Sequence, residues 1–190
     1  MSQFEYLAVL VSIVTGLGIV HLLSGVTHFI TAKGRWSPYW VHLVWTWNVF
    51  HYLVFFWWFV WRWTAVKEWR LTLFLFILLY AVVVYLLCAV LFPPGEEQTD
   101  FRTLYFQNRA WFFGLWILLM VIDVVDTKLK EQYGLSAFGV IDVIVWSVSI
   151  VGSLIAAVSK SHRIHAVWAM GFFLMMSVFE YLNFGTLRAD

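Results

Sequence analysis

The chain has 190 residues, of which 63% are hydrophobic, 21% are aromatic and only 12% are charged. A soluble domain of this size could not bury so much apolar surface, so the composition places the chain among membrane proteins. Its formal net charge of +1 provides no basic field for nucleic acid, and we expect no nucleic-acid partner. The single cysteine, Cys88, excludes an intramolecular disulfide.

Six apolar stretches fill the chain, and each is long enough to cross a bilayer. A transmembrane helix needs about 20 apolar residues to span the hydrocarbon core. The stretches cover approximately residues 4–31, 39–63, 71–92, 104–125, 137–158 and 164–184. Because the connections between them are short, the sequence predicts an all-α polytopic membrane protein. We expect one transmembrane domain over residues 1–190, built as a bundle of six helices.

The ends of the stretches carry helix-terminating and capping signals. The first stretch lacks a basic leader, carries Glu5 and is about 28 residues long, so we expect it to remain as a helix rather than be cleaved as a signal peptide. Thr99 or Asp100 is expected to cap the fourth helix. Six spans put both termini on one side of the membrane. Lys and Arg are divided equally between the two sides, which leaves the orientation open.

The second stretch is unusually aromatic, since about half of the residues from Tyr39 to Trp63 are Trp, Tyr or Phe. Aromatic residues at the two ends are typical of membrane interfaces. Those in the middle allow two interpretations. They either pack against lipid and neighbouring helices, or they line a cavity for a flat or apolar ligand.

Ionisable residues inside a membrane are functional candidates by default, and His21 and His51 lie deepest in their stretches. At 1.5 Å per residue, the two histidines stand within roughly 3 Å of the same depth. Together with Asn48 and Ser24 they form the predicted intramembrane polar centre. Its alternative roles are polar contacts that hold helices together, a pathway for protons or ions, and axial ligation of a non-covalent b-type haem by His21 and His51.

Three other histidines allow a second kind of cofactor site. His28, His42 and His165 stand at similar depth near three helix ends, on the side opposite the termini. A catalytic zinc ion needs three such ligands and an open position. A hydrolase would also need a general base, and the carboxylates of this chain lie toward the other side.

The acidic residues gather toward the side that holds the termini. Glu5, Asp123 and Glu180 are predicted to form an acidic cluster there, with Arg62 or Arg70 as cationic partners, and ion pairing alone is the alternative role. Two further carboxylates have local explanations. Asp126 precedes Lys130 by four residues, a spacing that pairs them on one helical face. Asp142 lies near a helix N-terminus, where the helix dipole favours an anion.

Glycines predict how the first helix packs. Gly18 and Gly25 share the helical stripe of His21 and His28. Because small residues allow close approach between membrane helices, we expect the first helix to pack centrally in the bundle through these glycines.

The opening run carries a resemblance. Phe4-Glu5-Tyr6-Leu7, Val11-Ser12-Ile13, Gly16-Leu17-Gly18-Ile19 and His21-Leu22-Leu23 resemble a recurrent group of uncharacterised bacterial six-helix membrane proteins, and the similarity extends loosely over the chain. It implies a multi-pass protein of the bacterial inner membrane and implies no activity. Trp36-Ser37-Pro38 before a Trp-rich helix also resembles, over about 30 residues, the tryptophan-rich sensory proteins of the TspO family, which have five helices and bind porphyrins and sterols. We transfer no site residue from either group.

The sequence therefore favours a non-enzymatic membrane protein. Our leading expectation is a conduit or transporter for protons or another small solute, embedded in lipid and assembled as a homo-oligomer. The alternatives are a haem-binding electron-transfer subunit and an intramembrane zinc-dependent hydrolase.

Overall fold

The computed structural model describes residues 3–31, 38–93, 100–137 and 139–184. In these ranges the chain forms six long helices: α1 (Gln3–Thr31), α2 (Trp40–Trp61), α3 (Leu71–Leu91), α4 (Phe101–Gln132), α5 (Val140–Val158) and α6 (His162–Phe184). A short 3-10 helix, η1 (Arg62–Ala65), extends α2. All six long helices have the length and apolar composition of membrane spans, which confirms the prediction of an all-α, multi-pass protein.

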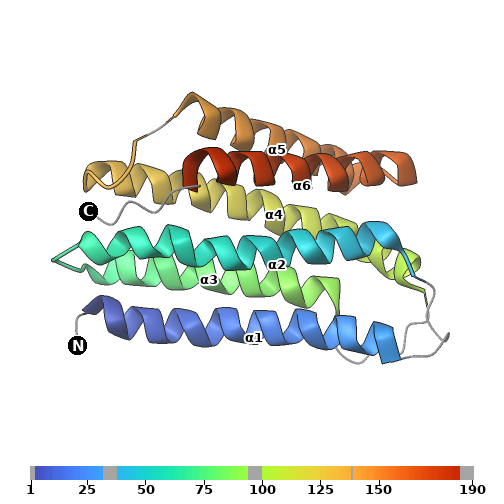
Figure 1. Cartoon of the computed structure of the whole chain (residues 1–190), viewed down its shortest axis with the longest axis horizontal. Coiled ribbons are helices and arrows are strands. Elements are labelled where there is room, and N and C mark those ends of the chain that lie inside the picture. Colours follow the sequence, from blue (N-terminus) through green and yellow to red (C-terminus); the bar gives the residue numbers. More distant parts are fainter. Residues whose placement is uncertain (1–2, 32–37, 94–99, 138, 185–190) are drawn as a thin grey trace.

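The helices run side by side along the long axis of the molecule, and α1 begins at the same end at which α6 finishes (Figure 1). We call this end of the bundle side A and the other end side B. α1 lies at one edge and packs mainly against α3, while α4 packs against α3 and α5, and α6 against α2 and α5. The arrangement agrees with the predicted placement of both termini on one side.

α4 is longer than the sequence predicted. It covers Phe101–Gln132, whereas the predicted helix covered 104–125. Asp100 caps its start, as predicted, by accepting hydrogen bonds from the Arg102 backbone N–H (3.0 Å) and the Thr103 hydroxyl (2.5 Å). These donors stabilise the carboxylate and hold the pKa of Asp100 below its usual range. The other proposed cap, Thr99, lies outside the described residues.

The length of α4 places its two ends outside the hydrocarbon. A helix of 32 residues is about 48 Å long, whereas the hydrocarbon core of a bilayer is about 30 Å thick. The first turns of α4 therefore reach the headgroup region on side B, and its last turns reach that region on side A.

The middle of the bundle is filled with aromatic side chains. Trp45 of α2 contacts rings of α4 and α6, and the contacting pairs within this group have ring centroids 4.9 to 6.0 Å apart. We call the group the aromatic layer; it consists of Trp45, Phe112, Phe113, Trp116 and Phe172. Such tilted and edge-to-face packing shows that Trp45 of α2 belongs to a packed core at this depth.

The two glycines of α1 face α3, as the sequence suggested. A Cβ atom at Gly18 would lie 3.2 Å from the Cys88 sulfur, and one at Gly25 would collide with the Phe92 ring. The expectation of a central α1 is wrong, however, because α1 lies at the edge of the bundle and buries mainly the stripe that meets α3. The small residues bring two neighbouring helices together without placing α1 at the centre.

Candidate functional site: a buried carboxylate network

Three ionisable side chains of α4 point into the bundle in its side A half. Asp123, Asp126 and Lys130 are separated by three and four residues, which places them on one helical face. Asp126 and Lys130 are only 3% and 4% exposed. Because charged groups among apolar helices are costly, their partners decide what they can do.

Asp126 and Lys130 satisfy each other within a closed set of contacts. The Lys130 ammonium group donates to the Asp126 carboxylate and to the carbonyl oxygen of Phe59 (2.8 Å). The Trp63 indole N–H donates to the other Asp126 oxygen (2.9 Å), and the Lys130 nitrogen lies 5.5 Å from the centroid of the Trp63 ring. The predicted pair is therefore confirmed, but it lies inside the bundle and joins α4 to α2 and η1.

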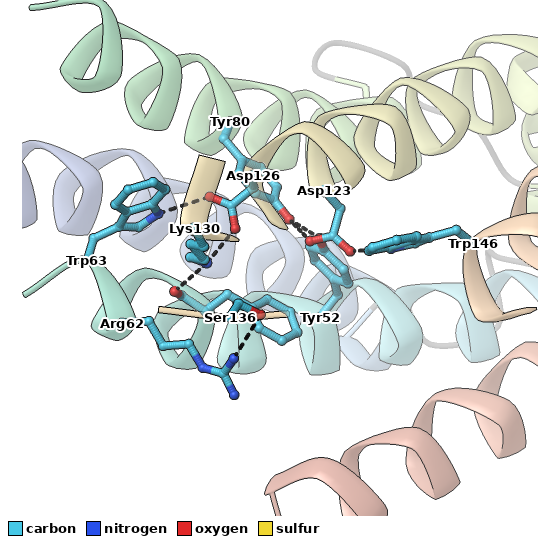
Figure 2. A network of polar contacts seen from close by, with 10 residues as sticks. Tyr52, Arg62, Trp63, Tyr80, Asp123, Asp126, Lys130, Ser136 and Trp146 are labelled. Carbon is cyan, nitrogen blue, oxygen red and sulfur yellow. Dashed lines mark hydrogen bonds and ion pairs between the residues drawn. The ribbon is translucent and has the colours of Figure 1, made fainter. Parts of the chain in front are cut away.

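Asp123 has a different environment. The Tyr80 hydroxyl donates to one oxygen (2.9 Å) and the Trp146 indole N–H to the other (2.7 Å). Tyr80 in turn shares a hydrogen bond of 2.6 Å with the Tyr52 hydroxyl. Figure 2 shows these side chains meeting from four helices, α2, α3, α4 and α5. Among the described residues, Asp123 forms no salt bridge.

A small polar pocket adjoins this network at side A, with a volume of about 60 Å³. Three carboxylates and two cations line it together with smaller polar and aromatic groups; these residues are Phe59, Arg62, Asp123, Asp126, Thr127, Lys130, Ser136, Asp142, Trp146 and Phe179. The Arg62 guanidinium donates to the Ser136 hydroxyl (3.4 Å) beside it (Figure 2). Asp142 accepts from the Gly139 backbone N–H (2.8 Å) at the start of α5, as its position near a helix N-terminus predicted.

The structure gives His21 and His51 separate partners. The His21 Nε2 atom lies 2.7 Å from the carbonyl oxygen of Phe92, where α3 ends. The His51 Nε2 atom lies 2.9 Å from a carboxylate oxygen of Glu180 on α6. The two imidazoles therefore do not face each other as axial haem ligands would.

The rest of the predicted polar centre is also dispersed. Asn48 donates to the carbonyl oxygen of Ala169 on α6 (3.2 Å), and Ser24 is exposed on α1. Together with the two histidines, these groups form contacts between pairs of helices rather than one site. The interpretation as polar contacts that hold helices together fits this arrangement.

The predicted acidic cluster does not assemble either. Glu5 is exposed in the first turn of α1. Asp123 belongs to the tyrosine network, and Glu180 pairs with His51. Similar depth brought these three residues together in the sequence interpretation, but their helices point them in different directions.

The three histidines proposed for zinc also have separate surroundings. His28 is exposed and bonds within α1 to the Ser24 carbonyl (3.2 Å). His42 is buried against the rings of Phe92 and Phe101, whereas His165 shares a hydrogen bond with the Tyr105 hydroxyl (2.8 Å). Within the described ranges, no group of three His, Cys, Asp or Glu side chains is arranged to hold a metal ion. The zinc site is not formed.

Sequence reasoning missed the neutral members of the network. Tyr52, Trp63, Tyr80 and Trp146 are ordinary aromatic residues of apolar helices until a carboxylate is placed beside them. One signal could have pointed to the site, since Asp123, Asp126 and Lys130 repeat at helical spacing and so mark a polar face on α4. We find no matching family model for the chain, and no significantly similar curated protein or solved structure.

Proposed function

We propose that this protein is a conduit for protons across a membrane, with Asp123 as the group that accepts and releases the proton. The hydrogen-bonded chain from Tyr52 through Tyr80 to Asp123 carries this proposal. A tyrosine hydroxyl both donates and accepts a hydrogen bond. A proton can therefore move along the chain by exchange of hydrogen bonds, without movement of a helix.

Asp123 suits this role better than Asp126. The Asp126 carboxylate is neutralised by Lys130, which also holds the Phe59 carbonyl. Protonation of Asp126 would leave a buried ammonium group without its counter-charge, which is costly. The hydrogen bonds of Asp123 come from neutral tyrosine and indole donors, so this carboxyl group can exist in both protonation states with its partners in place.

The dimensions of the polar pocket favour a proton over a larger solute. Pockets that hold small molecules have volumes of about 300–1,000 Å³, whereas this pocket has a volume of about 60 Å³, which is enough for water. Water there would connect Asp123 to the aqueous phase on side A, because Arg62 and Asp142 lie near the side A ends of their helices and Ser136 lies in the connection between α4 and α5.

The aromatic layer would act as the barrier toward side B. Tyr52 packs against Trp116 of this layer, with ring centroids 5.7 Å apart. Beyond it, the Tyr105 hydroxyl bonds to His165, whose other nitrogen lies 3.1 Å from the carbonyl oxygen of Ser159. Among the described residues, no hydrogen bond connects the two sides of the aromatic layer. We infer that this state is closed and that entry of water or movement of rings would open it, as hydrophobic constrictions do in channels.

The membrane and the assembly state are part of the same proposal. The resemblance of the opening run supports a place in the bacterial inner membrane. A homo-oligomer remains our prediction.

Proton flux into liposomes tests the function. Liposomes that contain the purified protein and a pH-sensitive dye are given a potassium diffusion potential, and the internal pH is recorded. We expect the wild type to conduct and Asp123→Asn to fall to the leak of protein-free liposomes. Glu131→Gln removes one carboxylate from the exposed part of the same helix and is the matched control, with flux equal to wild type.

Two results would oppose the proposal. The first is wild-type flux no greater than that of protein-free liposomes. The second is unchanged flux in an Asp123→Asn variant that remains monodisperse in detergent and helical by circular dichroism.

A further inference from the structure

A second pocket, with three cationic side chains around it, lies at side B, remote from the carboxylate network. It is shallow, has a volume of about 450 Å³, and is lined by Arg102, Thr103, Phe106, Gln107, Arg109 and Lys160. The first five residues occupy one side of the first turns of α4, and Lys160 comes from the connection between α5 and α6. Three cationic side chains therefore converge on one opening from two parts of the chain.

These three cationic side chains are available to bind an anion. Within the described ranges, Arg102, Arg109 and Lys160 form no salt bridge. One Arg109 nitrogen donates to the Phe106 carbonyl (2.5 Å), while its Nε atom is buried and has no partner among the described residues. Asp100 lies beside Arg102, but its oxygens already accept from the Thr103 hydroxyl and the Arg102 backbone.

Tyr39 lies on the same side of the bundle, close enough for its hydroxyl to be influenced by the positive charge of Arg102. Burial raises the pKa of the Tyr39 hydroxyl, and the positive charge of Arg102 acts in the opposite direction. Tyr39 thus stays neutral at physiological pH and does not offer the pocket a competing anion.

We propose that this pocket binds a phosphate group, supplied by the headgroup of an anionic phospholipid. Arginine and lysine side chains recognise phosphate through charge-assisted hydrogen bonds. The first turns of α4 lie at headgroup depth, where basic pockets between transmembrane helices bind anionic headgroups.

An exposed aromatic side chain favours a lipid over free phosphate. Trp111 follows Gln107, which forms one edge of the pocket, by four residues, so it lies one turn deeper below that edge. Its side chain is 75% exposed. A lipid whose headgroup occupies the cationic pocket can therefore lay its acyl chain along Trp111, whereas inorganic phosphate would gain nothing from this contact.

Thermal unfolding of the purified protein in a neutral detergent tests the site. Phosphatidylglycerol, phosphatidylcholine with the same acyl chains, and inorganic phosphate are titrated separately. A ligand that binds only the folded protein raises the unfolding midpoint. We expect phosphatidylglycerol to raise the unfolding midpoint. In Arg102→Gln/Lys160→Gln, the lipid concentration that gives half of this effect should be at least about tenfold higher than in wild type.

Single substitutions provide a matched comparison. Lys160→Gln and Arg163→Gln each remove one positive charge from exposed positions three residues apart. Arg163 lies against a different, apolar hollow formed with Gly152 and Trp168. We expect only Lys160→Gln to weaken the effect of phosphatidylglycerol, and Trp111→Ala to weaken it without any change in net charge.

Each outcome distinguishes the sources of the phosphate. Stabilisation by phosphatidylglycerol alone supports the lipid site. Equal stabilisation by inorganic phosphate, lost in Arg102→Gln/Lys160→Gln, supports the anion site and overturns its assignment to a lipid. The site itself is overturned if both anions act equally on wild type and the double variant, if neither anion acts, or if Arg163→Gln has the same effect as Lys160→Gln.

Discussion

At the scale of single residues, partners separate the buried ionisable groups into structural and functional candidates. Lys130 has a carboxylate, a carbonyl oxygen and an aromatic face around its ammonium group, and Asp126 has both Lys130 and Trp63. Because the charged groups of this pair all have partners, the pair has a structural role and holds α2, η1 and α4 together. Asp123 instead ends a chain of hydroxyl groups beside a polar pocket, which leaves its protonation state free to change.

A double substitution tests the structural role of the Asp126–Lys130 pair. Lys130→Met removes the only cation bonded to Asp126 among the described residues and leaves a buried carboxylate unpaired, so we expect it to lower the free energy of unfolding by about 3 kcal/mol or more. Asp126→Asn/Lys130→Met keeps an acceptor for Trp63 and removes both charges. It should recover most of the loss in equilibrium unfolding in mixed micelles.

The comparison of the two variants is decisive for this pair. If the double variant is as unstable as Lys130→Met, the loss arises from packing around the lysine stem rather than from an unpaired charge.

At the scale of helices, the membrane makes element prediction reliable and packing prediction unreliable. The apolar lengths identified all six spans because the thickness of the bilayer sets the length of a spanning helix. The Asp126–Lys130 pair was also predictable, since both residues belong to one helix. The partners of His21 and His51 were not, because depth along a helix does not determine its rotation or the identity of its neighbour.

The contact between α1 and α3 provides a prediction at this scale. Gly18→Leu would drive a side chain into Cys88 and the α3 backbone at Tyr85. Overpacking of this kind costs about 1–3 kcal/mol, so the unfolding midpoint in detergent should fall. Gly16→Leu is the control on the same helix, because a Cβ at Gly16 meets nothing within 4 Å. Equal midpoints for the two leucine variants would show that α1 does not dock through Gly18.

At the scale of the whole molecule, the alternating path of six spans gives the bundle two chemically different ends. Side A holds the carboxylate network and its small pocket, and side B holds the cationic pocket around Arg102 and Lys160. Composition predicted the membrane fold, but the two sites depend on contacts between helices distant in the sequence. Tyr52 and Tyr80 show this best, since nothing local to either residue indicates that their hydroxyls meet.

Cysteine labelling tests the alternating path. In a Cys88→Ala background, single cysteines replace Lys67 and Gln132 at side A, and Thr31 and Ser161 at side B; all four positions are exposed. Gly134 is avoided because its φ of 69° is strained for cysteine. A membrane-impermeant reagent applied from one face should label one pair only. Labelling of one position from each pair would contradict the six-span arrangement or show insertion in both orientations.

Proton flux through Tyr80→Phe tests the central claim most directly. This substitution removes one oxygen atom, keeps the aromatic ring, and leaves both carboxylates and Lys130 unchanged, so it breaks the chain between Tyr52 and Asp123 and alters little else. We predict that flux in liposomes falls to the leak of protein-free vesicles, while the protein stays folded and Glu131→Gln conducts like wild type. Wild-type flux through a folded Tyr80→Phe variant would contradict a proton path along these hydroxyl groups.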